Sequence, residues 1–96
     1  MPHLYILLCG DNPYYVGSTS DLESRVESHA SGTGSEYTRR RRPVRLVHCE
    51  EYDRVEDAFR REKQVQNWGR AKREALISGD QAALRYLSRG RDRGPA

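Results

Sequence analysis

The N-terminal segment predicts a β-hairpin, which is the feature that most limits the folds open to this chain. Residues 4–9 form a continuous apolar run, short enough for a strand that is buried on both faces. Residues 10–13 are rich in turn formers, and residues 14–16 are aromatic and β-branched, as is typical of a returning strand. Tyr5 and Tyr15 should therefore lie near each other across the hairpin.

After the hairpin, helical patterns surround one further strand. The sequence Ser-Asp-Leu-Glu at residues 20–23 is a capping box, which predicts the start of a helix, and Gly32 should end that helix. A polar loop with one helical turn then leads to the third strand. The next predicted elements are a strand over residues 44–49 and a helix that Asp53 caps, that carries an apolar stripe over residues 55–66 and that Trp68-Gly69 ends. Two shorter helices are predicted over residues 70–77 and 80–87. This order predicts an α+β fold, in which a small antiparallel or mixed sheet is covered by helices.

The length of 96 residues allows one domain. We expect this domain over residues 1–87 and a disordered, mobile tail over residues 88–96, which has no apolar side chain worth burying. The N-terminus lacks the pattern of a secretory signal, and no apolar run is long enough to span a membrane. Cys9 and Cys49 lie in strand-like segments and should be small buried residues, which suits a reducing cytoplasm.

Four residues near the hairpin could carry proton transfer and phosphate binding. A tyrosine is a poor base at neutral pH, but a nearby cation makes the phenolate of Tyr5 or Tyr15 accessible. Arg25 and His29 are one helical turn apart and share a face, where the guanidinium could grip a phosphate and the imidazole could pass a proton. The alternative for Tyr5 and Tyr15 is that they are β-favouring aromatic residues that pack in a pair of strands. The alternative for Arg25 and His29 is that both face solvent on a helix.

Glu62 lies in the middle of the apolar stripe predicted for residues 55–66. A carboxylate there is either buried at high cost or faces a cation in a cleft. Pairing with Arg61, Lys63 or Arg25 is the competing interpretation. One carboxylate is too few to cage a metal, but it suits Mg²⁺ or Mn²⁺ that keeps most of its waters.

A run of arginines predicts a polyanionic partner. Lysine and arginine exceed the acidic residues, giving a formal net charge of +3. Four arginines follow one another, with Tyr37 just before them, so phosphate-binding charge is combined with an aromatic ring that could stack on a base. The alternative is a solvated charge run. The candidate nucleic-acid-binding residues are Tyr37, Arg39, Arg40, Arg41, Arg42 and Arg45.

Taken together in order, these residues resemble the GIY-YIG nuclease family over roughly residues 3–77. The tyrosine of His3-Leu4-Tyr5 stands in the first family motif, whose glycine and isoleucine are not kept, and Tyr15-Val16-Gly17 matches the second motif. The stretches over residues 35–39 and 61–68 resemble the small stand-alone bacterial branch. Arg25 stands at the position of the family's arginine, and His29 stands where the family has a histidine or tyrosine. Glu62 stands at the position of the family's metal-binding glutamate.

The resemblance implies a three-stranded antiparallel sheet flanked by helices and magnesium-dependent cleavage of nucleic-acid phosphodiesters. It also implies that a tyrosine activates water, the arginine holds the phosphate and the glutamate binds the metal. Two departures stand out. Ser18 replaces a lysine that some relatives have, and Asn67 comes too early to match an asparagine that many relatives place downstream of the glutamate.

Three hypotheses about function remain open at this stage. The first is a metal-dependent endonuclease acting on nucleic acid, with DNA favoured over RNA and a role in DNA repair. The second is a nucleic-acid-binding module of the same fold with weak or no catalysis. A protein-interaction domain is the third, but it leaves Glu62 in an apolar stripe unexplained. The sequence does not decide the strand or junction preference, or the oligomeric state.

Overall fold

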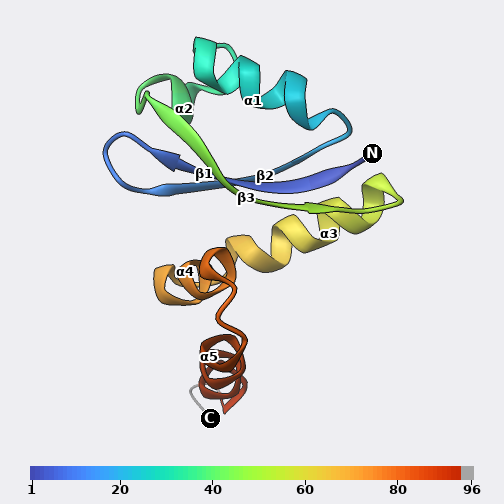
Figure 1. Cartoon of the computed structure of the whole chain (residues 1–96), viewed down its shortest axis with the longest axis vertical. Coiled ribbons are helices and arrows are strands. Elements are labelled where there is room, and N and C mark those ends of the chain that lie inside the picture. Colours follow the sequence, from blue (N-terminus) through green and yellow to red (C-terminus); the bar gives the residue numbers. More distant parts are fainter. Residues whose placement is uncertain (94–96) are drawn as a thin grey trace. The chain divides into compact units, whose positions relative to one another are not determined.

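The computed structural model describes residues 1–93 and divides the chain into two compact units (Figure 1). The first unit, Met1–Gln66, contains the sheet, and the second begins at Asn67 and contains the last two helices. The division falls after the long helix, and the single domain expected over residues 1–87 stays a prediction.

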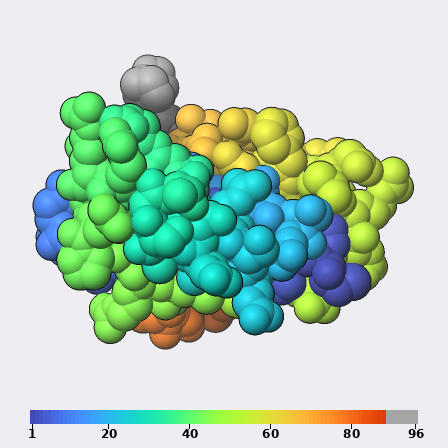
Figure 2. All heavy atoms as spheres, turned by 90° about the horizontal axis from the view of Figure 1, so that it is seen from above, coloured from blue at the N-terminus to red at the C-terminus, as the bar shows by residue number. Residues whose placement is uncertain are grey.

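The first unit is a three-stranded antiparallel sheet with helices on both faces. Its strands are β1 (His3–Cys9), β2 (Tyr14–Thr19) and β3 (Val44–Glu51), arranged in the order β2-β1-β3. Figure 1 shows α1 and α2 on one side of the sheet and α3 on the other. In the space-filling view of Figure 2, α1 and the segment leading to α2 cover the face that the viewer sees. The helices are α1 (Leu22–Ser31), α2 (Glu36–Arg39) and α3 (Val55–Gln66). The α+β prediction is confirmed, and the sheet is wholly antiparallel.

Strand β1 forms the centre of the core because it is paired on both edges and covered on both faces. Its residues Leu4, Tyr5, Ile6 and Leu7 have no exposed surface. The apolar run that predicted a strand buried on both faces is confirmed. Val16 of β2 and Ala58 and Val65 of α3 are also buried in the first unit.

Local signals predicted the ends of α1 closely, with one shift. The side chain of Asp21, not Ser20, caps the helix by accepting a hydrogen bond from the Ser24 amide at 3.2 Å. Both residues are good cap formers, so the sequence signal was ambiguous by one position. Gly32 ends α1 with a φ of 91°, in the left-handed region that glycine adopts without a steric penalty.

A register irregularity in β3 changes the predicted burial of one cysteine. Ile6 pairs with His48 and Leu7 pairs with Leu46, so Val47 is the extra residue of a bulge. A bulge interrupts strict alternation along the strand. Cys9 is buried as predicted, but Cys49 is exposed, and both thiols are free.

The second unit is a pair of helices, α4 (Arg70–Ser78) and α5 (Gln81–Arg93), which contact each other. The Asp80 carboxylate accepts a hydrogen bond from the Ala83 amide at 3.0 Å, so the predicted cap is confirmed. Helix α5 continues to Arg93, beyond the predicted end at residue 87. Residues 88–93 of the expected tail are therefore helical, and its last residues, 94–96, lie outside the described part. Within residues 1–93, none of the helices combines the length and the apolar character needed to cross a bilayer.

Candidate active site

The two tyrosines lie on the same face of the sheet, as the hairpin predicts. Tyr5 pairs with Gly17 across β1 and β2, and Tyr15 is two residues before Gly17, so its side chain emerges on the same side. The centroids of the two rings are 6.4 Å apart. This separation is in the range of favourable contact between aromatic rings.

Gly17 gives the Tyr5 ring room to lie across the neighbouring strand. A Cβ atom at Gly17 would be 2.5 Å from both Cζ and Oη of Tyr5, far inside van der Waals contact. Gly17 lies within β2 and needs no unusual backbone angle. The glycine of the second motif is thus explained by the close approach of the tyrosine from the first motif.

A hydrogen-bonded chain runs from Tyr5 into α1 and α2. The Tyr5 hydroxyl lies 2.9 Å from Nε2 of His29, and Nδ1 of His29 lies 2.7 Å from the Thr38 hydroxyl. His29 and Thr38 have no exposed surface. The Tyr15 ring packs on His29 with centroids 5.0 Å apart. Helix α1 therefore delivers His29 to the tyrosine pair, while α2 delivers Thr38 to the far side of the imidazole.

Arg25 completes this group and shapes its proton affinities. Burial and the neighbouring Tyr15 raise the pKa of Tyr5, a hydrogen bond and positive charge from Arg25 lower it, and the result is about 12. Burial, with a smaller contribution from the Arg25 charge, lowers the pKa of His29. At neutral pH, Tyr5 therefore holds its proton, and the His29 imidazole is neutral and able to accept one.

Glu62 lies on α3 and reaches the edge of the sheet at β2. Its side chain is 13% exposed. The Ser18 hydroxyl donates to Oε1 of Glu62 at 2.5 Å, and the Gln66 amide donates to Oε2 at 2.7 Å. Among the ion partners that the sequence left open, Lys63 lies 3.7 Å away, whereas Arg61 binds Glu50 instead. Ser18, the residue that replaces the family's lysine, is thus a direct partner of the carboxylate.

The apolar stripe around Glu62 is only partly buried. Ala58 and Val65 are buried, whereas Val55 and Phe59 are about half exposed. Next to them is a cavity of about 310 Å³, whose lining includes Ser18, Arg25, Ala58 and Phe59. The stripe faces both the sheet and this cavity. A substrate that entered the cavity would meet Arg25, which lines it.

The arginine run is engaged with acidic and backbone partners. Arg39 and Arg40 both pair with Glu36 at 2.9 Å. Arg41 pairs with Asp11 at 3.2 Å, and its guanidinium lies 3.9 Å above the centroid of the Tyr37 ring. The remaining two are Arg42, which donates to the Arg39 carbonyl at 3.2 Å, and Arg45, which is exposed on β3.

Tyr37 joins this segment to the candidate site. Its ring centroid lies 5.8 Å from that of Tyr15, and 39% of Tyr37 is exposed. Aromatic contacts therefore extend from the buried Tyr5 through Tyr15 to a ring at the surface. The residues that the sequence grouped as proton carriers and as base-stacking candidates are continuous in space.

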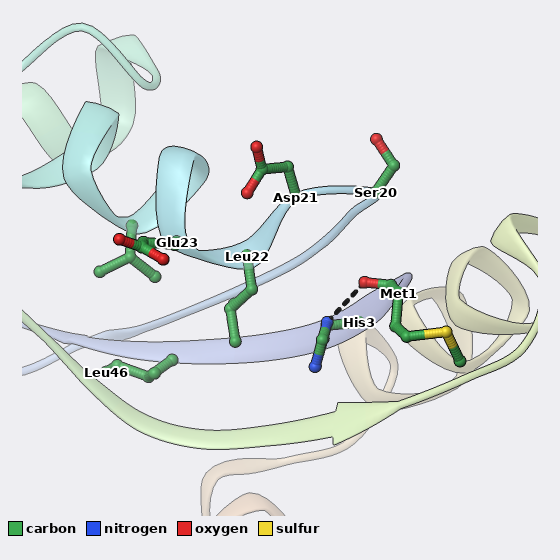
Figure 3. Close-up of a pocket in the computed structure, with 8 residues that line it drawn as sticks. Met1, His3, Ser20, Asp21, Leu22, Glu23 and Leu46 are labelled. Atoms are coloured by element: carbon green, nitrogen blue, oxygen red, sulfur yellow. Dashed lines mark hydrogen bonds between the residues drawn. The ribbon is translucent and has the colours of Figure 1, made fainter.

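A larger hollow lies apart from these residues, and Figure 3 shows its lining. It has a volume of about 590 Å³ and contains apolar side chains, among them Leu22 and Leu46, together with the carboxylates of Asp21 and Glu23. None of the predicted site residues lines it. Its acidic groups would repel phosphate, so the smaller cavity beside Arg25 fits nucleic acid better.

Sequence reasoning missed three partners of the site. Thr38 lies in the segment that carried the family resemblance, and Ser18 was noticed only as a departure from the family. Gln66 was placed on the α3 stripe, and the structure shows it donating to both Glu62 and the Val16 carbonyl. Their contacts with Glu62, His29 and the Val16 carbonyl join residues that are far apart in the sequence, and only the bond between Gln66 and Glu62 is local. A local sequence pattern carries no signal for contacts between distant residues.

The comparison with known proteins identifies the family. The family model described as the GIY-YIG catalytic domain matches residues 1–75, and the chain belongs to this family. The UPF0213 protein of Halobacterium salinarum is 45% identical over 77 residues, covering 80% of this chain and all of that protein. A UPF0213 protein of Bacillus velezensis is 42% identical over 73 residues, covering 76% of this chain and 74% of its own length. The small stand-alone branch therefore has archaeal as well as bacterial members.

A solved relative supports the fold. The solution NMR structure of the UPF0213 protein BH0048 from Bacillus halodurans is 42% identical and covers 83% of this chain and 86% of its own, with a TM-score of 0.55. The protein EF2693 from E. faecalis, also solved by NMR, is 33% identical, covers 80% of this chain and 82% of its own, and has a TM-score of 0.54.

Proposed function

We propose that this protein is an endonuclease that hydrolyses phosphodiester bonds in nucleic acid with the help of one Mg²⁺ or Mn²⁺ ion. The observation that carries the proposal is the contact of Tyr5 with a neutral base, His29, and a phosphate-binding group, Arg25. Membership of a nuclease family supports the reaction class. We favour DNA over RNA as the substrate, and cleavage assays with matched DNA and RNA strands test that choice.

Glu62 fits the role of metal ligand. Among the described residues, no three side chains of the types His, Cys, Asp and Glu come together as a metal cage. The lone carboxylate is nevertheless held in place by Ser18 and Gln66, as ligating carboxylates commonly are. One protein oxygen suits an ion that takes its other ligands from water and phosphate. Such an ion, when bound, offsets the negative charge that develops on the phosphate.

Arg25 changes partner in the proposed reaction. In the free protein the positive charge of Arg25 is close enough to Tyr5 to lower the pKa of its hydroxyl, and Tyr5 has no exposed surface. A phosphate entering the cavity would attract the guanidinium, because a charged acceptor binds arginine more strongly than a phenol does. Arg25 then holds the phosphate, and the Tyr5 oxygen is freed to accept a hydrogen bond from water.

Tyr5 and His29 together act as the base. A phenol with a pKa of about 12 is a weak acid, so a free tyrosinate is scarce at neutral pH. A relay avoids that species: water gives a proton to the Tyr5 oxygen as the Tyr5 hydroxyl gives its own to Nε2 of His29. The resulting hydroxide forms the new P–O bond, the bond to the leaving oxygen breaks, and solvent protonates that oxygen. Tyr15 packs against His29 and orients it.

Glu62→Gln tests the proposal because it preserves side-chain size and removes the charge. The variant should bind nucleic acid nearly as well as the wild type and lose metal-dependent cleavage. Glu56→Gln is the matched control, since Glu56 is an exposed glutamate on the same helix. Retention of metal-dependent cleavage by Glu62→Gln would contradict the proposal.

A second candidate function is nucleic-acid binding without useful turnover. The high pKa of Tyr5 and its full burial favour it, because both slow proton transfer from water. Chelation separates the two candidates: binding survives removal of divalent ions in both cases, and only an endonuclease shows cleavage that the ions restore.

The free thiols bear on the location of the protein. Cys49 is exposed and unpaired with Cys9, and an accessible thiol persists best where the redox buffer is reducing. We therefore propose the cytoplasm as its compartment.

A further inference from the structure

The hydrogen-bonded chain through His29 has a direction, which its two ends determine. At one end, the Tyr5 hydroxyl has a proton to donate and no exposed surface. This proton needs an acceptor within the protein, because a buried hydroxyl without one is costly. His29 offers the acceptor, since its Nε2 lies 2.9 Å from the hydroxyl.

At the other end, the backbone carbonyl of Ser35 can only accept. The Thr38 hydroxyl lies 3.4 Å from this carbonyl and 2.9 Å from the Ser35 hydroxyl. The Ser35 hydroxyl already accepts a bond from the Thr38 amide at 3.2 Å, which fixes Ser35 beside Thr38. Thr38 can therefore donate its single proton to Ser35, and in that arrangement it accepts the bond from His29, whose Nδ1 lies 2.7 Å away.

These two ends select one imidazole tautomer. The proton of neutral His29 lies on Nδ1 and points to Thr38, while Nε2 carries a lone pair that points to the Tyr5 hydroxyl. The opposite tautomer would direct an N–H group at Tyr5, whose own proton would then lose His29 as its acceptor. A buried hydroxyl proton without an acceptor is costly, and Tyr5, His29 and Thr38 all have no exposed surface.

We propose that Thr38 is a positioning residue that holds His29 in the tautomer able to take the proton of Tyr5. The effect of Thr38 on catalysis rests on the nuclease function proposed above. The tautomer of His29 does not depend on that function. The proton moves from Tyr5 to Nε2 of His29, and the imidazolium keeps its Nδ1–H bond to Thr38. Helix α2 thereby contributes to the reaction through Thr38, although Thr38 does not touch the substrate.

The experiment compares Thr38→Val with Thr33→Val and reads the His29 tautomer directly by nitrogen-15 NMR. Valine keeps the shape of threonine and cannot accept the Nδ1–H bond. Thr33 is the matched control, because it is an exposed threonine in the loop between α1 and α2 whose hydroxyl bonds to the Ser28 carbonyl and Ser31. The wild type and Thr33→Val should both show a protonated Nδ1 and a bare Nε2.

In Thr38→Val, the Nε2–H tautomer should become populated, and kcat should fall at least about tenfold with KM little changed. Thr38→Ser restores the hydroxyl and should restore both readings. A protonated Nε2 in the wild type, or an unchanged tautomer in Thr38→Val, overturns the proposal. The wild-type spectrum and Thr38→Ser decide the matter even if the valine variant does not fold. A Thr38-dependent tautomer in a protein that cleaves no substrate supports this assignment and refutes the nuclease function instead.

Discussion

Replacing Gly17 by alanine tests the link between the second motif and the first. The new Cβ would lie 2.5 Å from Cζ and Oη of Tyr5, about 1 Å closer than carbon atoms pack without repulsion. Tyr5 cannot easily retreat, because it has no exposed surface and lies on the central strand. Overpacking of this kind costs about 1–3 kcal/mol.

A displaced Tyr5 ring would also weaken the bond to His29. A buried polar group that loses its partner costs about 1–3 kcal/mol more. The free energy of unfolding should therefore drop by roughly 2–6 kcal/mol, a large part of the 5–15 kcal/mol typical of a domain. Cleavage by the remaining folded protein should be lost as well, since the proton acceptor no longer faces the hydroxyl.

Urea denaturation followed by circular dichroism measures the change. Gly69→Ala serves as the control, because a Cβ at Gly69 meets no atom within 4 Å. That variant should stay within about 1 kcal/mol of the wild type, the cost of placing alanine at the N-cap of α4. A Gly17→Ala protein that is as stable as this control, or that cleaves at the wild-type rate, refutes the close-approach explanation of the motif glycine.

Three other outcomes are expected. Burial alone would raise the pKa of Glu50, but hydrogen bonds, led by the one from Arg61, lower it to about 2, below the 4.5 of the free group. The stability that this adds, about 3 kcal/mol, is full above pH 4.5 and is lost as the pH falls toward 2. Urea titrations at several acidic pH values should show this loss in the wild type but not in Glu50→Gln, and equal slopes would contradict it. Tyr5→Phe should fold and lower kcat about 100-fold or more, and a wild-type rate would remove Tyr5 from the proton relay. Arg45→Ala should reduce the slope of log affinity against log salt by about one, and an unchanged slope would exclude Arg45 from the phosphate contacts.

The arginine segment shows how tertiary contacts reduce a sequence-based expectation. Four consecutive arginines suggested free positive charge, yet Arg39 and Arg40 share the carboxylate of Glu36, and Arg41 is held by Asp11. These are exposed pairs, which contribute little stability and exchange readily with phosphate. The segment remains our candidate for nucleic-acid binding, with its electrostatic attraction moderated by its own acidic neighbours.

The sequence by itself determined the elements whose signals are local. The apolar run and the turn formers specify the hairpin, Gly32 ends α1, and Asp80 caps α5, because each depends on residues within a few positions of one another. Periodicity also placed Glu62 on an apolar stripe, where a lone carboxylate indicates a function.

Only the tertiary structure decided how these elements complete a site. Tyr5 and His29 are 24 residues apart and Ser18 and Glu62 are 44 apart, so no local pattern records their hydrogen bonds. Cys49 is exposed on β3, and the bulge in that strand depends on its pairing with β1, which no local pattern records. Gly17 could serve a turn, a ligand or a neighbouring ring, and only the packing of Tyr5 against it decides among them. Hydrogen-bond direction likewise needs every partner in place, because each donor in the chain from Tyr5 to Ser35 constrains the next.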